Sequence, residues 1–229
     1  MFEMLKGIYV LERMGLMHRD LKPSNFLYSH NTRRGYITDF GLAEVVLTSP
    51  PEQPLNQEDS LILRLYELQK QGKIFNRYGT RGYMAPEVVF NQELQSTAVD
   101  VWSAGVTLLS MLTRHHPNML PVDRETIASD KVKDILPFVC LFGYEGVIKL
   151  ATQVFSKKCL KIECELALPS PYHFIKPLDI ENLICERFSK SFKKRGADLL
   201  RKIFIGDWTI RYTAADALAH DFFKEVRGR

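Results

Sequence analysis

Three short motifs in a fixed order constrain this chain more than any other feature of its sequence. The first is His18-Arg19-Asp20-Leu21-Lys22-Pro23-Ser24-Asn25, the second is Asp39-Phe40-Gly41, which begins 14 residues after Asn25, and the third is Ala85-Pro86-Glu87. Each motif alone is more typical of a turn or of a solvated charge cluster than of a functional site. The three together, in this order, form a far more specific pattern.

With these motifs the chain resembles the eukaryotic protein kinase family, and the resemblance extends from its first helix to its last. It implies the C-terminal lobe of the protein-kinase-like fold over residues 1–229, mainly α with a small β hairpin and α+β overall. The N-terminal β lobe is expected to be absent from this chain, because no Gly-x-Gly-x-x-Gly motif occurs and Lys6 is the only lysine before Asp20. Inserts are expected at about 45–76, in the activation segment, and at about 120–189, between the central and late helices.

The resemblance implies a serine/threonine kinase that uses ATP and Mg²⁺ as cofactors. Phosphoryl transfer requires a hydroxyl and a triphosphate to be held in line while charge is neutralised. Asp20 is expected to accept or orient the hydroxyl proton, and Asn25 and Asp39 offer the oxygen ligands that Mg²⁺ prefers. Lys22 is expected beside the γ-phosphate, as in serine/threonine kinases. Thr80 is expected to hydrogen-bond both Asp20 and Lys22 and to close the substrate site.

Other residues are expected to support or extend this site. By the same resemblance, Asp100 hydrogen-bonds the backbone of the catalytic loop, and Glu87 pairs with Arg211. Arg81 is a candidate for recognising an acidic or phosphorylated residue after the target Ser or Thr, because a guanidinium group suits carboxylate and phosphate oxygens. The alternative for Arg81 is a surface side chain that contributes nothing measurable.

Within the family, the chain resembles the kinases that fire replication origins, the cell division control protein 7 type. The residues that carry this resemblance are 22–28, 79–88 and 100–106. Casein-kinase-1-like enzymes share Asn25-Phe26-Leu27 but lack a clean Ala-Pro-Glu, so they match less well. The resemblance implies a role in the cell cycle and in the initiation of DNA replication, and a location in the nucleus, with the cytoplasm as an alternative. Its implied partners are protein substrates, including minichromosome-maintenance helicase subunits, and an activating regulatory subunit.

The segment before Thr80 leads to a hypothesis about activation. Residues 73–79 contain no Ser or Thr, and their only hydroxyl side chain is Tyr78. A phosphoserine or phosphothreonine close before Gly79 is therefore missing as a partner for Arg19. We expect activation by a docked partner instead.

Composition excludes several other classes of protein. The chain has 31 Lys and Arg against 27 Asp and Glu, a net charge of +4, which does not suggest direct binding to nucleic acid. No apolar run approaches the roughly 18 residues of a membrane span, and the four cysteines contain no Cys-x-x-Cys pair. We therefore expect an intracellular chain with free thiols and no membrane partner. The basic run at 190–195 is either a nuclear address, a patch for an acidic partner or, more simply, a solvated helix face.

Hydrophobic periodicity and turn residues predict the elements of structure. The pattern predicts a first helix over 2–14 that ends at Gly15, a hairpin from 26–28 and 36–38, and a buried central helix over 97–113. Later helices are predicted at roughly 124–136, 144–155, 186–205 and 213–225, the last with Thr213 and Asp216 as a near capping box. A proline-rich segment at 48–56, a short helix at 59–71 and an irregular segment at 168–177 complete the prediction.

Two functional hypotheses remain open on the sequence alone. In the first, the chain is part of a complete kinase or begins at an internal Met. In the second, it is an inactive lobe that serves as a binding module for a regulatory subunit. The presence of Asp20, Lys22, Asn25 and Asp39 together favours the first, because a binding module has no chemical need for all four. For the chain by itself, we expect negligible ATP affinity and turnover.

Overall fold

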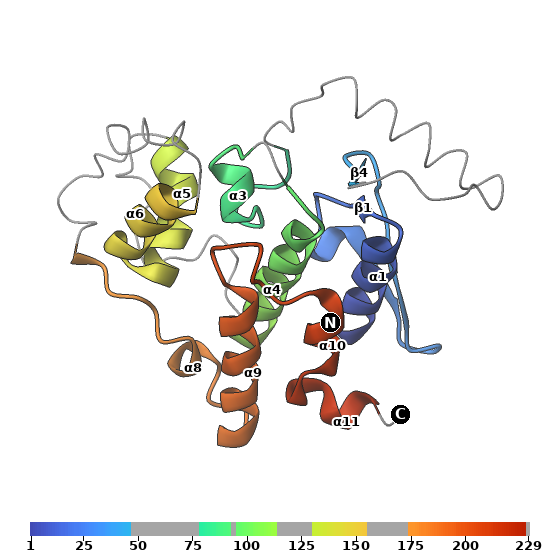
Figure 1. The fold of residues 1–229 in the computed structure, drawn as a ribbon. Helices are drawn as coiled ribbons and strands as arrows, with labels where there is room; N and C mark the ends of the chain where they lie inside the picture. The colour runs from blue at the N-terminus through green and yellow to red at the C-terminus, as the bar shows by residue number, and fades with distance from the viewer. Residues whose placement is uncertain (47–77, 93–94, 114–129, 155–173, 228–229) are drawn as a thin grey trace.

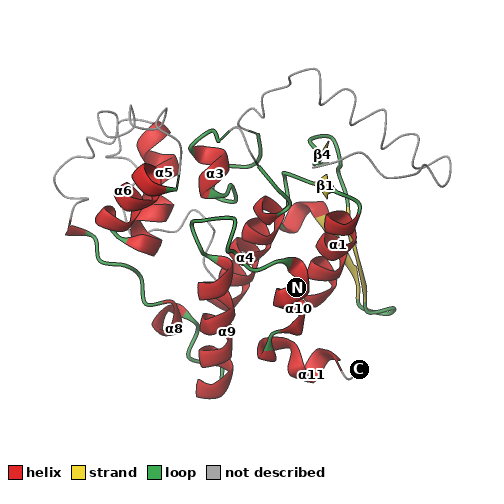
Figure 2. Ribbon diagram, in the orientation of Figure 1, coloured by secondary structure: helices red, strands yellow, loops and turns green. Residues whose placement is uncertain are grey.

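Helices dominate the structure, a computed structural model that describes residues 1–46, 78–92, 95–113, 130–154 and 174–227. Two small two-stranded sheets lie beside them, towards the N-terminal part of the chain (Figures 1 and 2). Helix α4 (Ala98–Thr113) lies at the centre, with α9 (Lys190–Ile203) and α1 (Phe2–Arg13) next to it (Figure 1). This architecture confirms the prediction of a mainly helical chain with a small β hairpin.

The central helix α4 is buried on almost every side, as its apolar sequence predicts. Its Trp102 packs against Phe138 and Phe204, with ring centroids 5.7 and 4.9 Å apart. Gly105 lets α9 approach closely, because a Cβ atom at this position would lie 2.4 Å from Cγ2 of Ile203. The helix is therefore a rigid base on which the other elements pack.

Helix α1 buries one face, through Met4, Leu5, Ile8 and Leu11 at helical spacing. It ends as predicted, because Gly15 takes a positive φ of 63° directly after the C-cap residue Met14. The far end of the chain packs on it: the carboxylate of Glu12 accepts a hydrogen bond of 3.0 Å from the backbone N–H of Ala214.

The final helical region begins with the predicted capping box. Thr213 and Asp216 exchange both hydrogen bonds at the start of α10 (Ala214–Ala219). The prediction of one continuous helix to residue 225 is wrong, because His220 is extended, with ψ at 145°. The chain continues as the 3₁₀ helix η5 (Asp221–Phe223) and the short helix α11 (Lys224–Arg227). The His220 side chain caps this turn by accepting from the backbone N–H of Phe222.

The hairpin consists of strands β2 (Phe26–Ser29) and β3 (Arg34–Ile37), paired antiparallel with Phe26 opposite Ile37. It confirms the predicted hairpin. The second sheet pairs β1 (Leu16–Met17) with β4 (Glu44–Val45), and the sequence did not predict it. A strand of two residues is too short to show the alternation of apolar and polar residues by which strands are predicted. This sheet brings β4 next to the catalytic loop.

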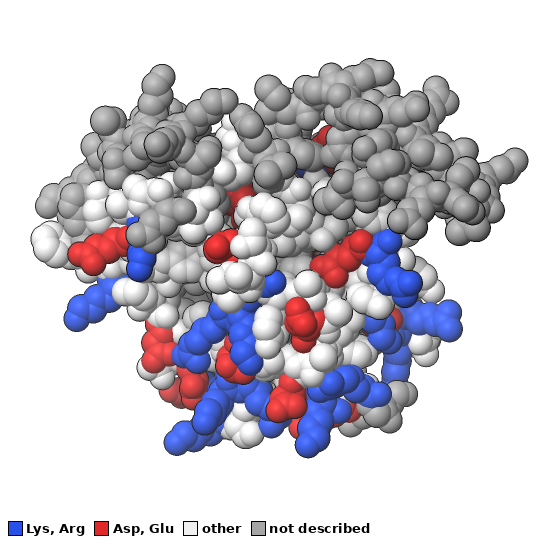
Figure 3. Space-filling model, viewed as in Figure 1, with Lys and Arg blue, Asp and Glu red and all other residues white. Residues whose placement is uncertain are grey.

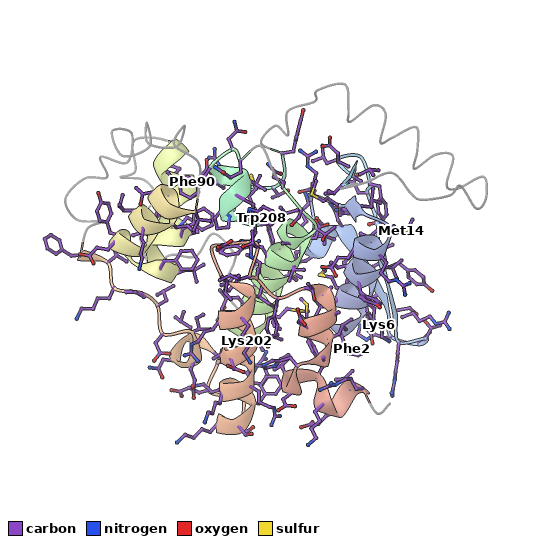
Figure 4. The ribbon with its side chains drawn as sticks, viewed as in Figure 1. Phe2, Lys6, Met14, Phe90, Lys202 and Trp208 are labelled. Atoms are coloured by element: carbon purple, nitrogen blue, oxygen red, sulfur yellow. The ribbon has the colours of Figure 1, made fainter. Side chains whose placement is uncertain are left out.

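The region predicted as a second insert contains three described helices, α5 (Asp130–Phe142), α6 (Tyr144–Gln153) and α8 (Ile180–Leu183). Helix α5 runs past the predicted end at residue 136 and contains Pro137. It packs against Phe90, which follows helix α3 (Pro86–Val89) and is labelled in Figure 4. The ring centroids of Phe90 and Phe138 are 6.1 Å apart.

Taken one at a time, the described helices are too short or too polar to cross a membrane. The pair Lys133–Phe142 and Tyr144–Thr152, bent by 106°, satisfies the length and composition criteria only when taken together. Its residues Phe138, Val139 and Val147 are buried in the protein core.

Among the described cysteines, Cys140 and Cys185 are free, and burial raises the pKa of the Cys140 thiol to about 11. Several predictions lie outside the described residues: the segments 48–56 and 59–71, the start of the helix at 124–136, most of the irregular segment at 168–177, the hydroxyl-free segment 73–77, and the free thiols expected at the other two cysteines, Cys159 and Cys164.

The basic run lies on α9, which begins at Lys190, directly after the N-cap residue Ser189, and ends at Ile203, a few residues inside the predicted 186–205. Lys190 and Lys194 are exposed, and Arg195 forms an ion pair of 3.3 Å with Glu225. Figure 3 shows Lys and Arg side chains gathered on the lower part of the molecule in this view, with Asp and Glu side chains among them. This mixture of charges is typical of a solvated helix face.

Candidate active site

The catalytic loop, residues 18–25, is fastened to the central helix by a single buried carboxylate. Asp100, in the first turn of α4, accepts hydrogen bonds from the backbone N–H groups of His18, at 2.7 Å, and Arg19, at 2.9 Å. Burial raises the pKa of Asp100 to about 7, while the two N–H donors favour its charged form. These are the backbone contacts that the sequence predicted for Asp100.

Arg19 adopts a left-handed backbone conformation, with φ at 70°. This conformation costs a residue other than glycine about 1–2 kcal/mol. The hydrogen bonds to Asp100 hold the strained loop in place, and the next residue along the chain is Asp20. The turn therefore sets the direction in which the Asp20 side chain leaves the loop.

Asp20, Lys22 and Thr80 form a closed triangle of hydrogen bonds. The Lys22 Nζ donates to Asp20 Oδ2 at 2.7 Å and to Thr80 Oγ1 at 2.6 Å. The Thr80 hydroxyl donates in turn to Asp20 Oδ1 at 2.6 Å. The structure thus contains both contacts that the family resemblance implied for Thr80, which lies 60 residues from Asp20 along the chain.

These contacts determine the charge of Asp20. Burial by itself would raise its pKa, but the hydrogen bonds from Lys22 and Thr80 outweigh burial and hold the pKa below its ordinary value. Asp20 is therefore ionised at neutral pH. An ionised carboxylate with a low pKa orients a hydroxyl as a hydrogen-bond acceptor, and it becomes an effective proton acceptor only as that hydroxyl turns acidic.

Asn25 and Asp39 offer oxygen atoms that fit a magnesium ion. Asn25 ends the 3₁₀ helix η1 (Pro23–Asn25), and its Nδ2 donates to the backbone oxygen of Asp20 at 2.9 Å and to Asp20 Oδ2 at 3.2 Å. Both donations use the amide nitrogen, which leaves the amide oxygen to accept another partner. Asp39 is exposed, and its Oδ1 accepts from the backbone N–H of Gly41 at 3.4 Å.

The described residues include no group of three His, Cys, Asp or Glu side chains suited to a metal ion. Magnesium bound largely through phosphate oxygens needs only one or two protein ligands, so Asn25 and Asp39 suit it. When bound, the ion would neutralise the charge of the phosphates.

The first and second motifs are in direct contact. The fully buried His18 lies at an edge-on angle to the Phe40 ring, with centroids 4.9 Å apart. His18 Nε2 lies 2.9 Å from the backbone oxygen of Thr38 and donates to it, because Nδ1 accepts from the backbone N–H of Asp20 at 3.3 Å. Burial lowers the pKa of His18, so the ring is neutral and forms a fixed link between the motif around Asp39 and the catalytic loop.

The third motif is anchored by the predicted ion pair. Glu87 and Arg211 are paired through both carboxylate oxygens, at 2.7 and 2.9 Å, and both side chains are 0% exposed. Arg211 also donates to the backbone oxygens of Ala98, at 3.0 Å, and Ile205, at 2.9 Å. The pair therefore joins α3, the start of α4 and the loop after α9.

Arg81 is already engaged within the chain. Its Nε lies 2.8 Å from Oδ1 of Asp134 on α5, and the two side chains are 47% and 1% exposed. The ion pair gives Arg81 a defined partner, and the alternative of a surface side chain that contributes nothing measurable stays open, because many exposed ion pairs add little to stability. The proposed role of Arg81 in reading an acidic substrate residue stays a prediction, as do the catalytic roles of Asp20, Lys22, Thr80, Asn25 and Asp39.

Sequence reasoning missed Glu44, which forms an ion pair with Arg19 from strand β4. The only signal in the sequence was its position five residues after Asp39. The pairing depends on the β1–β4 sheet, which the sequence did not predict.

Comparison with known proteins gives a family match over nearly the whole chain. The family described as the protein kinase domain matches residues 1–223. The chain is 29% identical over 256 residues to the cell cycle protein kinase spo4 of Schizosaccharomyces pombe, covering 96% of this chain and 56% of that protein.

Two further relatives carry related names. The probable cell division control protein 7 homolog 2 of Encephalitozoon cuniculi is 32% identical over 228 residues, covering 93% of this chain and 61% of that protein. The cell cycle serine/threonine-protein kinase hsk1 of Schizosaccharomyces pombe is 36% identical over 147 residues, covering 58% of this chain and 28% of that protein. The chain thus spans at most 61% of the length of these relatives.

Proposed function

The chain belongs to the protein kinase family, and on that premise we propose that it transfers the γ-phosphate of ATP to serine and threonine hydroxyl groups of proteins. The single observation that carries this proposal is the hydrogen-bonded triangle of Asp20, Lys22 and Thr80. It places a carboxylate, an ammonium group and a hydroxyl together at one point, between the catalytic loop and the segment that leads to Ala85.

In the proposed reaction, Asp20 accepts a hydrogen bond from the substrate hydroxyl and orients its oxygen towards the γ-phosphorus. As the oxygen–phosphorus bond forms and the bond to the ADP oxygen breaks, Asp20 takes the hydroxyl proton. Lys22 stabilises the negative charge on the transferred group. Thr80, through its hydrogen bonds to both side chains, holds Lys22 and Asp20 in position. Asn25 and Asp39 would hold Mg²⁺, which neutralises phosphate charge.

We further propose that these residues form the C-terminal lobe of the kinase fold. Large apolar side chains are exposed beside the site: Leu27 at 59%, Phe40 at 46% and Leu42 at 37%. Leu27 follows Asn25 by two residues, and Phe40 and Leu42 flank Gly41. Apolar side chains in such a place fit contact with the base of a nucleotide or with a covering β lobe.

The subtype is also a proposal. The names of the relatives, a cell cycle kinase and a cell division control protein 7 homolog, support a role in cell-cycle control. We propose a function in the initiation of DNA replication, in the nucleus, with an activating regulatory subunit and minichromosome-maintenance helicase subunits as partners. Arg81, whose side chain is 47% exposed, stays our candidate for recognising an acidic or phosphorylated substrate residue.

The test is a transfer assay on the protein purified from its own cells with its bound partners. Wild-type protein should label serine or threonine of a substrate from ATP in the presence of Mg²⁺. The Asp20→Asn variant should lose about 10²–10⁴-fold of this activity. Glu186→Gln is the matched carboxylate-to-amide control, because Glu186 is exposed in the turn before α9 and is not among the residues of the site, and it should keep full activity.

Full activity in Asp20→Asn would contradict the assignment of the site. No transfer by wild-type protein, with a regulatory protein still bound, would favour the binding-module hypothesis instead.

A further inference from the structure

Glu44 is an acidic residue at the edge of the site that none of the predicted roles includes. It lies on β4, where it pairs with Met17 of β1, the residue just before the catalytic loop. Its carboxylate forms an ion pair with the Arg19 guanidinium. The Arg19 side chain is only 6% exposed and that of Glu44 is 21% exposed, so the pair is largely shielded from solvent.

Arg19 links the catalytic loop to two other segments. Its guanidinium lies over the ring of Tyr78, 4.7 Å from the centroid, and Tyr78 comes two residues before Thr80. The backbone of Gly79 passes so close to Arg19 that a Cβ atom there would lie 2.8 Å from the Arg19 carbonyl oxygen. Consecutive residues, Arg19 and Asp20, thus hold the segment 78–80, one through Tyr78 and the other through Thr80.

Among the described residues, Arg19 already has an anionic partner in Glu44. A nearly buried guanidinium group needs an anionic partner, because a stranded buried charge is strongly unfavourable. In kinases whose activation loop is phosphorylated, new pairs between arginine and the phosphate order that loop. Here a phosphate group, which carries nearly two negative charges, would have to compete with the Glu44 carboxylate for Arg19. The two like charges would repel each other. The pocket of Arg19 therefore holds its acidic partner without any modification.

We propose that Glu44 is a positioning residue that permanently takes the place of an activating phosphate on Arg19. It holds Arg19 over Tyr78, and through the adjoining backbone it holds Asp20 against Thr80. Ordering of the catalytic loop consequently does not require phosphorylation of the segment before Thr80. The consequence for turnover rests on the proposed kinase activity, but the structural role of Glu44 does not.

The experiment compares wild type with Glu44→Ala, Glu44→Gln and Glu44→Asp in two separate measurements. The first is backbone hydrogen exchange of residues 18–22 and 78–82, which needs no activity. Glu44→Ala should exchange at least about 10-fold faster in both segments, while α9 keeps the wild-type rate and shows that the fold is intact. Glu44→Asp retains the charge and should recover most of the protection.

The second measurement is steady-state transfer by the protein with its native partners. Glu44→Ala and Glu44→Gln should lower kcat about 10- to 100-fold, with KM for ATP changing less than about 2-fold, because Asp20 is displaced and nucleotide contacts are not. Phosphatase treatment of wild type, with phosphate removal checked by mass spectrometry, should change kcat less than about 2-fold.

Glu3→Ala is the matched control. Glu3 forms an ion pair of 2.7 Å with Lys6 on α1 and its side chain is also 21% exposed, but it lies outside the site. It should leave exchange and kcat unchanged. Wild-type exchange rates in Glu44→Ala, or a fall of more than about 10-fold in wild-type kcat after phosphatase treatment, would overturn the proposal. If wild type transfers no phosphate at all, the proposed function fails, and the exchange measurement still decides the role of Glu44.

Discussion

Replacing Arg211 with Met would remove one half of an ion pair in which both side chains are 0% exposed. Glu87 would then keep its carboxylate in the core without a cation. Removing one member of a buried ion pair costs about 3–5 kcal/mol of unfolding free energy. For a chain of this length, each kcal/mol lowers Tm by about 2–4 °C, so the expected fall is about 6–20 °C.

A second variant separates the stranded charge from the lost hydrogen bonds. In Glu87→Met/Arg211→Met no charge is left behind, and the main loss is the donation of Arg211 to the backbone oxygens of Ala98 and Ile205. Two such hydrogen bonds are worth about 1–3 kcal/mol together. The double variant should therefore be more stable than Arg211→Met alone, by about 2 kcal/mol.

Urea unfolding followed by tryptophan fluorescence measures both free energies. Trp102 is a suitable reporter, because its ring lies 5.0 Å from the Arg211 guanidinium and is almost fully buried. A loss of less than about 1 kcal/mol in Arg211→Met, or equal instability of the single and double variants, would refute the stranded-charge argument.

Three further changes test other parts of the structure. Thr80→Val removes a donor to Asp20, so the pKa of Asp20 should rise towards its ordinary value and the acid limb of the pH–activity profile should move to higher pH. The stability that Asp20 contributes, which is lost as pH falls through its lowered pKa, should also shrink, as acid unfolding would show. Gly105→Ala should destabilise the fold by about 1–3 kcal/mol in urea, because its methyl group would collide with Ile203 at 2.4 Å. Thr213→Ala should cost about 1 kcal/mol through loss of the N-cap, and Thr213→Ser should restore it.

Elements with a local cause could be predicted from the sequence. The first helix, its end at Gly15 and the capping box at Thr213 depend on residues a few positions apart, and each forms as predicted. The hairpin of β2 and β3 likewise follows from its own turn. The break before η5 also has a local cause, the His220 cap on the backbone N–H of Phe222, but the pattern of one continuous helix concealed it and the prediction failed there.

The candidate site divides in the same way. The motifs identified Asp20, Lys22, Asn25 and Asp39 by residue type and spacing, and the family resemblance added Thr80. The ion pair of Arg81 with Asp134 could not be predicted, because it joins residues 53 positions apart in the sequence. Neither residue type nor helical period carries information about such a pairing.

The sequence by itself determined which chemical groups this protein has and the order in which they occur, because side-chain chemistry and motif spacing are properties of the chain. Only the tertiary structure decided how they act together. Packing on α4 brings Thr80 within 2.6 Å of Asp20, and the unpredicted sheet of β1 and β4 puts Glu44 on Arg19. The pKa of Asp20 and the ion pair of Arg19 with Glu44 depend on distances between remote residues, and those distances exist only once the chain has folded.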